Sequence, residues 1–207
     1  MPTADEIEVS DFVRGYSSIN LERITFSWNG KHASDFSDGN QAFRFRVVES
    51  VCADPGAAPV GLLRDLFVES AKWTREAWGS PPGFSKLGAE LLRRGGEDTL
   101  ADFVWALGRS FDTWGACHEI WLDVILATRL AEVCGKRADG ASGEEDRRLW
   151  NGGKELLTKL SKGTAAQGWV VLKPGTAVSN VRVVPGWRHK LAVVSRKLGQ
   201  LFSSSPH

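Results

Sequence analysis

The most reactive residue types of the chain stand together at Cys117-His118-Glu119, within an apolar run from residue 111 to 130. A thiol beside an imidazole could form a nucleophilic pair, and all three residue types can bind zinc. Both chemistries need side chains that face one another. The apolar spacing, however, predicts a helix at about 98–134, in which consecutive residues point about 100° apart. On such a helix, Cys117 cannot use His118 as its base.

The same helix offers no pair of metal ligands. His118 has Trp114 four residues before it and Leu122 four residues after it, and Cys134 lies about 25 Å along the axis from Cys117. We expect His118 to be a buried imidazole, with a pH-sensitive or interface role as the alternative. We expect Cys117 to be a small buried side chain. The sequence predicts neither a metal site nor a cofactor.

Motifs for other chemistry are incomplete. In LWNGGKELL, a phosphate-binding loop would need glycine at 148 and Ser or Thr at 155, where the chain has Arg148 and Glu155. DFSDGN lacks the spacing of an EF-hand calcium loop. The motifs GxSxG, HExxH and GxGxxG are absent from the sequence. An enzyme whose site assembles from distant residues stays open, although no local motif predicts one.

The elements that would position these residues favour an α+β, predominantly α-helical fold. We expect a helical bundle around the long central helix at about 98–134, an N-terminal β-hairpin, and a C-terminal β-hairpin followed by an amphipathic helix. Alternating apolar residues in ITFSW and FRFRV, on either side of a turn-rich segment, predict the first hairpin. Pro174-Gly175 between two apolar runs predicts the second.

Capping residues and helical spacing predict the remaining helices. Four are expected: a short one after the capping box Thr3–Glu6, one from Pro59 to about Gly79, one over SKLGAELLRR up to Gly95-Gly96, and one capped by Ser142 and Glu145 that reaches Leu160. The central helix carries a packing seam of apolar residues at steps of three and four: Leu100, Val104, Leu107, Phe111, Trp114, His118, Trp121 and Ile125.

Composition limits the class of protein. The chain has 207 residues, of which 42% are hydrophobic and 25% charged, as is usual for globular proteins. Three cysteines with no CxxC spacing favour a reducing compartment over a disulfide scaffold. The first ten residues do not resemble a secretory signal, and no run of 18 apolar residues occurs. We therefore expect a cytoplasmic or otherwise intracellular protein without a transmembrane segment.

The net charge of +1 conceals a division along the chain. Residues 1–146 hold 15 Lys/Arg and 24 Asp/Glu, whereas residues 147–207 hold 11 Lys/Arg and one acid, Glu155. We expect an acidic hairpin and helical core at 1–140 and a basic helix–hairpin–helix segment at 141–207, packed on the same single domain. Such asymmetry indicates contact with nucleic acid, an anionic membrane or a complementary protein surface, or two segments that neutralise each other.

The leading hypothesis is a non-enzymatic protein that binds single-stranded nucleic acid and self-associates, as nucleocapsid and coat proteins do. The candidate phosphate contacts are Arg147, Arg148, Lys154, Lys159, Lys173, Arg182, Arg188, Lys190, Arg196 and Lys197, and the candidate stacking residues are Trp150, Trp169 and Trp187. The runner-up is a charge-asymmetric scaffold or adaptor subunit that meets a protein partner. A small enzyme with an assembled site comes third.

The helix expected at 187–202 allows several interpretations. Apolar residues occupy one side, and Arg188, His189, Lys190, Arg196 and Lys197 the other. Its apolar face could dock on the chain's own domain, on a partner or neighbouring subunit, or on an anionic membrane.

Overall fold

The computed structural model describes residues 3–163, which belong to one compact unit spanning Met1–Ala165. The described residues form eight α-helices connected by turns and short 3-10 helices, and they contain no β-sheet. The helices are α1 (Ala4–Arg14), α2 (Gln41–Ala53), α3 (Val60–Ala77), α4 (Phe84–Gly95), α5 (Leu100–Leu107), α6 (Phe111–Cys117), α7 (Val124–Asp139) and α8 (Glu144–Ser161). The expected α+β fold class is therefore wrong for this part of the chain.

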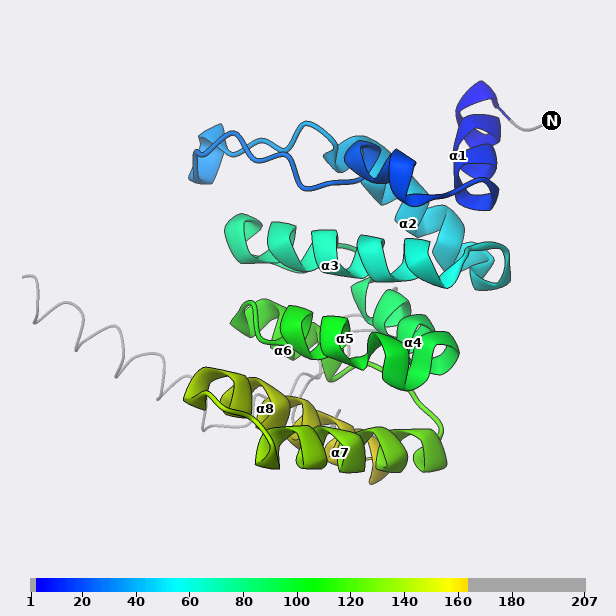
Figure 1. Ribbon diagram of the computed structural model, residues 1–207. Coiled ribbons are helices and arrows are strands. Elements are labelled where there is room, and N and C mark those ends of the chain that lie inside the picture. The colour runs from blue at the N-terminus through cyan, green and yellow to red at the C-terminus, as the bar shows by residue number, and fades with distance from the viewer. Residues whose placement is uncertain (1–2, 164–207) are drawn as a thin grey trace, which may run out of the picture. The chain divides into compact units, whose positions relative to one another are not determined.

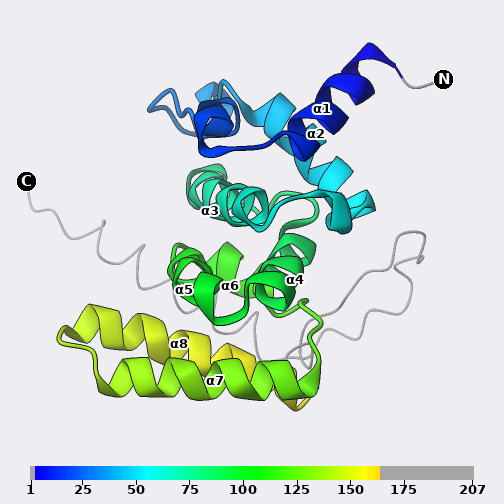
Figure 2. The same cartoon turned by 45° about the vertical axis from the view of Figure 1, so that its right-hand side comes forward.

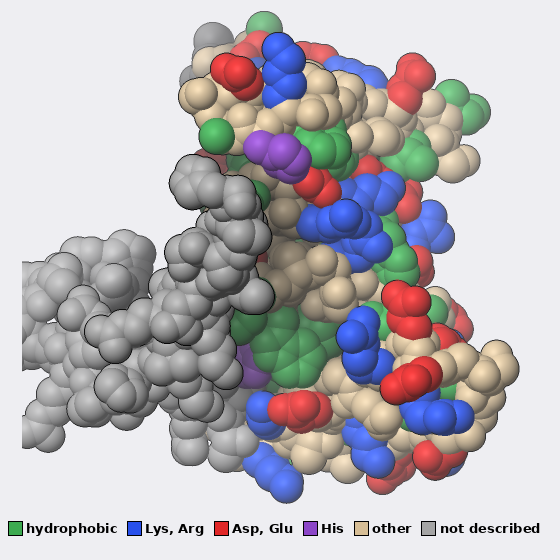
Figure 3. Space-filling view, turned by 90° about the vertical axis from the view of Figure 1, so that its left-hand side faces the viewer, with side chains coloured by type: hydrophobic (Ala, Val, Ile, Leu, Met, Phe, Trp, Pro, Cys, Tyr) green, Lys and Arg blue, Asp and Glu red, His purple; other side chains and the backbone are tan. Residues whose placement is uncertain are grey.

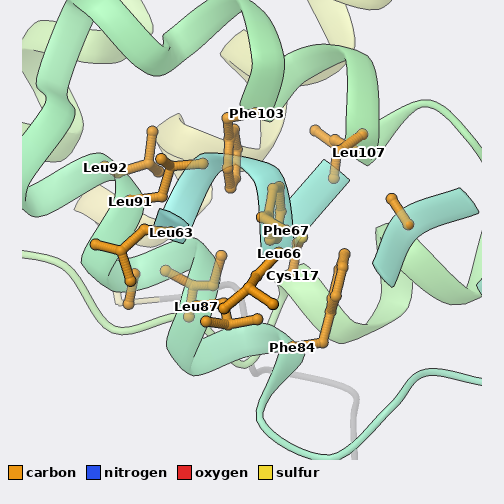
Figure 4. Packing of buried hydrophobic residues seen from close by; sticks show 14 of the residues in the cluster. Leu63, Leu66, Phe67, Phe84, Leu87, Leu91, Leu92, Phe103, Leu107 and Cys117 are labelled. Carbon is orange, nitrogen blue, oxygen red and sulfur yellow. The ribbon is translucent and has the colours of Figure 1, made fainter. Parts of the chain in front are cut away.

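The helices are stacked in successive layers. Figure 1 shows α1 and α2 above α3, then α4, α5 and α6, and finally the antiparallel pair of α7 and α8, an order that also holds in the rotated view of Figure 2. In the middle layers, the Phe67 ring stacks between Phe84 and Phe103, with ring centroids 4.5 Å and 5.4 Å away (Figure 4). Leucines of α3 and α4 close the space around these rings, so α3 is the central helix of the unit.

The predicted N-terminal hairpin is wrong. The second expected strand, FRFRV, lies within α2. The first expected strand, ITFSW, has one isolated bridge, between Trp28 and Asp38, as its only pairing among the described residues. The buried residues of α2 are Arg44, Val47, Val48 and Val51, which keep helical spacing. One position of this buried stripe is Arg44, which reads as polar in the sequence. The apolar residues of FRFRV therefore alternate along the sequence as they would in a strand.

Buried polar contacts hold the segment before α2 without strand pairing. The side chains of Arg44 and Asp38 form an ion pair with no exposure to solvent. Asp38 Oδ1 also accepts hydrogen bonds from the backbone N–H groups of Ser27 (3.0 Å) and Asn40 (3.1 Å). From α3, Glu69 accepts a hydrogen bond from the N–H of Phe26 at 2.8 Å. These bonds satisfy backbone groups that a hairpin would otherwise have paired.

The predicted long helix at 98–134 is also wrong, because the chain breaks twice within it. Ser110 caps α6 by accepting a hydrogen bond from the N–H of Thr113, and Asp123 caps α7 by accepting from the N–H groups of Ile125 and Leu126. Each new N-terminus turns the chain, so the predicted seam does not stay on one face. Leu100, Val104, Leu107 and His118 of the seam are buried, but Phe111, Trp121 and Ile125 are exposed.

Several predicted helices are confirmed. The capping box of Thr3 and Glu6 starts α1, α3 ends just before Gly79, and α4 ends at Gly95. At the start of α8 the predicted cap is wrong, since the N-cap residue is Gly143 and not Ser142. The expected division near residue 140 falls in the turn between α7 and α8, which pack against each other. The second hairpin and the helix expected at 187–202 lie outside the described residues.

Candidate functional site

Four of the ten predicted phosphate contacts lie in the described part of the chain, and all four belong to α8. They are Arg147, Arg148, Lys154 and Lys159. The other six lie outside the described residues, as do two of the three stacking candidates: Lys173, Arg182, Arg188, Lys190, Arg196, Lys197, Trp169 and Trp187. The structure therefore brings together only the part of the predicted surface that one helix carries.

The bases of α8 do not form a surface of one sign. The first turn of the helix is acidic, with Glu144 and Glu145 beside Arg148 in a shallow hollow. Arg147 donates a hydrogen bond to the carbonyl oxygen of Ala141 at 3.1 Å. Lys159 donates to Glu155 Oε1 at 2.6 Å, which partly neutralises its charge. On the face drawn in Figure 3, acidic and basic side chains are likewise interspersed over the described helices.

Trp150 is buried and is not displayed for stacking. Its side chain is 8% exposed, and the guanidinium of Arg137 lies 4.9 Å from its ring centroid. The indole thus belongs to the contact between α7 and α8, with a cation over its outer face. A nucleic-acid base could reach this ring only if Arg137 moved away, so the function proposed below does not use Trp150.

Cys117 and His118 end α6 as core residues, as expected. The Nδ1–H of His118 donates to the carbonyl oxygen of Trp114 at 2.8 Å, and the two rings meet edge to face. Cys117 is fully buried, and this burial raises the pKa of its thiol well above the ordinary value. A thiol that resists ionisation is a poor nucleophile and a poor metal ligand. Within residues 3–163 no three His, Cys, Asp or Glu side chains are grouped so as to hold a metal ion.

One hollow lies between α2 and the start of α4. It has a volume of about 550 Å³ and is lined by Phe45, Arg46, Val48, Glu49, Cys52, Ala53, Pro82, Gly83 and Lys86. The thiol of Cys52 faces the carbonyl oxygen of Gly83 at 3.8 Å, and burial raises its pKa. The lining combines an apolar floor with two cations and one carboxylate. The hydrogen bond described for this thiol goes to a backbone carbonyl, and not to a side chain that could act as its base.

The surface feature that the sequence prediction missed is a group of exposed apolar side chains at the start of α7. Trp121 is 77% exposed, Val124 57% and Ile125 80%. We call these three residues the 121–125 patch. The predicted buried seam includes Trp121 and Ile125, but not Val124, because the predicted helix runs straight through position 120. Asp123, a strong N-cap residue, was the signal that could have placed a helix start here.

Comparisons with protein-family models, with curated proteins and with solved structures found no match to this chain. The described part of the chain is thus a unit of eight α-helices. Acidic and basic residues are distributed unequally along the sequence. Among the described helices, none is long and apolar enough to cross a membrane.

Proposed function

We propose that the protein is a non-enzymatic, self-associating protein that binds single-stranded nucleic acid through residues 164–207, in a reducing intracellular compartment. One observation carries this proposal. All 25 acidic residues of the chain fall within residues 3–163, which hold 20 Lys/Arg. The 44 residues from 164 to 207 hold six Lys/Arg and no acid. Counted in this way, the helical unit has a net charge of −5 and the rest of the chain +6.

This division replaces the one drawn at residue 146, because α8 belongs to the helical unit. The net charges on the two sides are smaller than the −9 and +10 counted there, but the basic side now holds no acid. A basic segment free of acids attracts phosphates by releasing their condensed counterions, without reading base sequence. Two tryptophans in it, Trp169 and Trp187, supply rings on which bases can stack. The acidic helical unit repels nucleic acid, and its carboxylates can attract the basic segment of another copy.

The first test is the absorbance ratio at 260 and 280 nm of protein purified without nuclease. We expect a high ratio that falls after nuclease treatment and a high-salt wash, and binding of labelled single-stranded RNA that returns at low salt. A protein-like ratio throughout, together with no RNA binding at low salt, would show that the basic segment serves another partner.

A scaffold or adaptor subunit is the second candidate, and the 121–125 patch favours it. Clusters of exposed apolar side chains mark protein–protein contact sites. In this case, a different protein would copurify with the chain in a fixed ratio and would remain bound after nuclease treatment. Both candidates weaken in salt, so nuclease sensitivity is the property that separates them.

A further inference from the structure

The 121–125 patch lies open to solvent on residues that the unit does not need for its own core. Its three apolar side chains occur within five residues, one just before α7 and two in its first turn. The neighbouring Leu122 and Ala127 are buried and anchor this corner of the unit. Single exposed apolar residues are common on proteins, whereas a cluster that includes tryptophan is typical of an interface.

Three of the four charged residues from Glu119 to Glu132 are acidic, and we call these three acids the acidic rim of the patch. Glu119 and Asp123 are exposed beside it, and Glu132 is exposed two turns further along α7. Arg129, the one base between positions 119 and 132, lies with its Nε 3.7 Å from Glu97 Oε1. Two copies of this patch placed face to face would bring like charges together, which disfavours a symmetric contact. A basic segment with an apolar side fits the patch better.

Residues 187–202 have this chemistry in their sequence. Six apolar residues keep helical spacing: Trp187, Leu191, Val194, Leu198, Leu201 and Phe202. In the helix expected there, at about 100° per residue, Lys190 and Lys197 fall on the part of the polar side that borders the apolar stripe, and Arg196 falls opposite the stripe. The stripe could thus cover Trp121 and Ile125 while the two lysines meet the acidic rim. Arg196 would stay available for phosphate.

We propose that the 121–125 patch of one copy binds residues 187–202 of a second copy. This inference rests on the self-association in the proposed function and specifies the surfaces that carry it. Two different surfaces of the same chain make a head-to-tail contact, which repeats from copy to copy and builds a ring or an open chain. The 23 residues from 164 to 186 can span roughly 75 Å when extended, so a neighbouring patch is within reach.

The test uses nuclease-treated full-length chains in sedimentation velocity over a range of concentrations. We expect the wild-type chain to form a concentration-dependent series that extends beyond dimers. A patch variant, Ile125→Asp, and a segment variant, Leu191→Asp with Leu198→Asp, should each sediment as a single chain. Mixed in equal amounts, the two variants should form a complex of two chains that grows no further, because one intact patch meets one intact segment.

The matched control is Ile19→Asp, since Ile19 is 86% exposed and Ile125 80%. It should assemble like the wild-type chain. An aspartate at position 125 lies in the first turn of α7, where the helix dipole favours a negative charge, so the patch variant should keep its fold. Unchanged far-ultraviolet circular dichroism and thermal midpoint check this expectation.

Three results would overturn the inference. They are a patch variant that assembles like the wild-type chain, a mixture of variants that stays as single chains, and a wild-type chain that is monomeric at every concentration.

The RNA affinity of Ile125→Asp, measured where the chain is monomeric, separates this inference from the proposed function. If the two-chain complex forms but no chain binds RNA, the nucleic-acid proposal fails alone. If RNA binding persists without the complex, the inference fails alone.

Discussion

At the scale of single residues, Arg44 and Arg46 show how burial decides what a charge contributes. Both belong to α2, but the ion pair of Arg44 with Asp38 is fully buried, whereas Arg46 and its partner Asp5 are exposed. Removing one partner of a buried pair leaves an uncompensated charge in the core. We expect Arg44→Ala to lower the free energy of unfolding by about 3–5 kcal/mol.

Arg46→Ala is the control for that variant, because exposed ion pairs contribute less than about 1 kcal/mol. Urea denaturation of both variants and the wild-type chain measures the difference. Equal losses in the two variants would mean that the Arg44–Asp38 pair does not anchor the segment before α2.

The three cysteines differ in burial, and their reactivity should follow. Cys52 is partly exposed, whereas Cys117 and Cys134 are buried, and burial raises the pKa of all three thiols, that of Cys134 to about 12. At neutral pH a thiol-modifying reagent should label Cys52 first, and more slowly than a free cysteine, because less thiolate is present. Mass spectrometry of partly labelled protein checks the order. Labelling of Cys117 in the folded chain before Cys52 would contradict it.

The buried thiols also predict how stability depends on pH. Their pKa values are higher in the folded than in the unfolded chain, so they stabilise the fold fully below the ordinary cysteine value near 9.0. Stability should fall as the pH rises above that value, since only the unfolded chain can then release these protons. Denaturation curves from pH 7 to 10 measure the loss, and Cys134→Ala should make it smaller. The same loss in the variant would assign it to other groups.

At the scale of elements, the helices with clear ends were predictable and the others were not. The capping box at Thr3 and the glycines at the end of α4 mark boundaries that the structure confirms. The false hairpin arose because Arg44, a core residue, broke the apolar pattern of α2. The false long helix arose because apolar spacing continued across the caps Ser110 and Asp123. Apolar periodicity alone does not show which polar residue is buried in the core, or which polar residue within an apolar run starts a new helix.

The packing of α8 predicts opposite effects for two adjacent glycines. A Cβ atom at Gly153 would lie 2.6 Å from Val104 Cγ2 and 3.3 Å from Cys134 Sγ, so α8 would have to move away from α5 and α7. Gly153→Ala should therefore destabilise the fold by about 1–3 kcal/mol. A Cβ atom at Gly152 would make an ordinary 3.4 Å contact with Trp114. Gly152→Ala should stabilise the helix by about 0.5–1 kcal/mol.

Thermal or urea denaturation of the two glycine variants tests the close approach of α8. A stabilised Gly153→Ala variant would show that α8 does not pack against Val104 as closely as the structure indicates.

At the scale of the whole molecule, the charge division was predictable from the sequence, but its consequence for the surface was not. The predicted basic surface on α8 is interrupted by the acidic first turn of that helix and by the pair of Lys159 with Glu155. Burial of Trp150 removed one stacking candidate. The acidic first turn and the i,i+4 spacing of Glu155 and Lys159 are visible in the sequence. The burial of Trp150 is not, because it depends on which face of α8 meets α7. The nucleic-acid proposal therefore rests on residues 164–207 and on their contrast with the acidic helices.

The most direct test of the central claim is the salt dependence of single-stranded RNA binding by the full chain. The measurement is made at concentrations where the chain is monomeric, so that Lys190 and Lys197 do not meet a neighbouring copy. If the six bases of residues 164–207 then each contact a phosphate, the slope of log affinity against log salt should be about −4, at roughly 0.7 per contact. Replacement of Arg188, Lys190, Arg196 and Lys197 by Gln should flatten the slope by about 3. An unchanged slope in this variant, or no binding at low salt, would contradict the account.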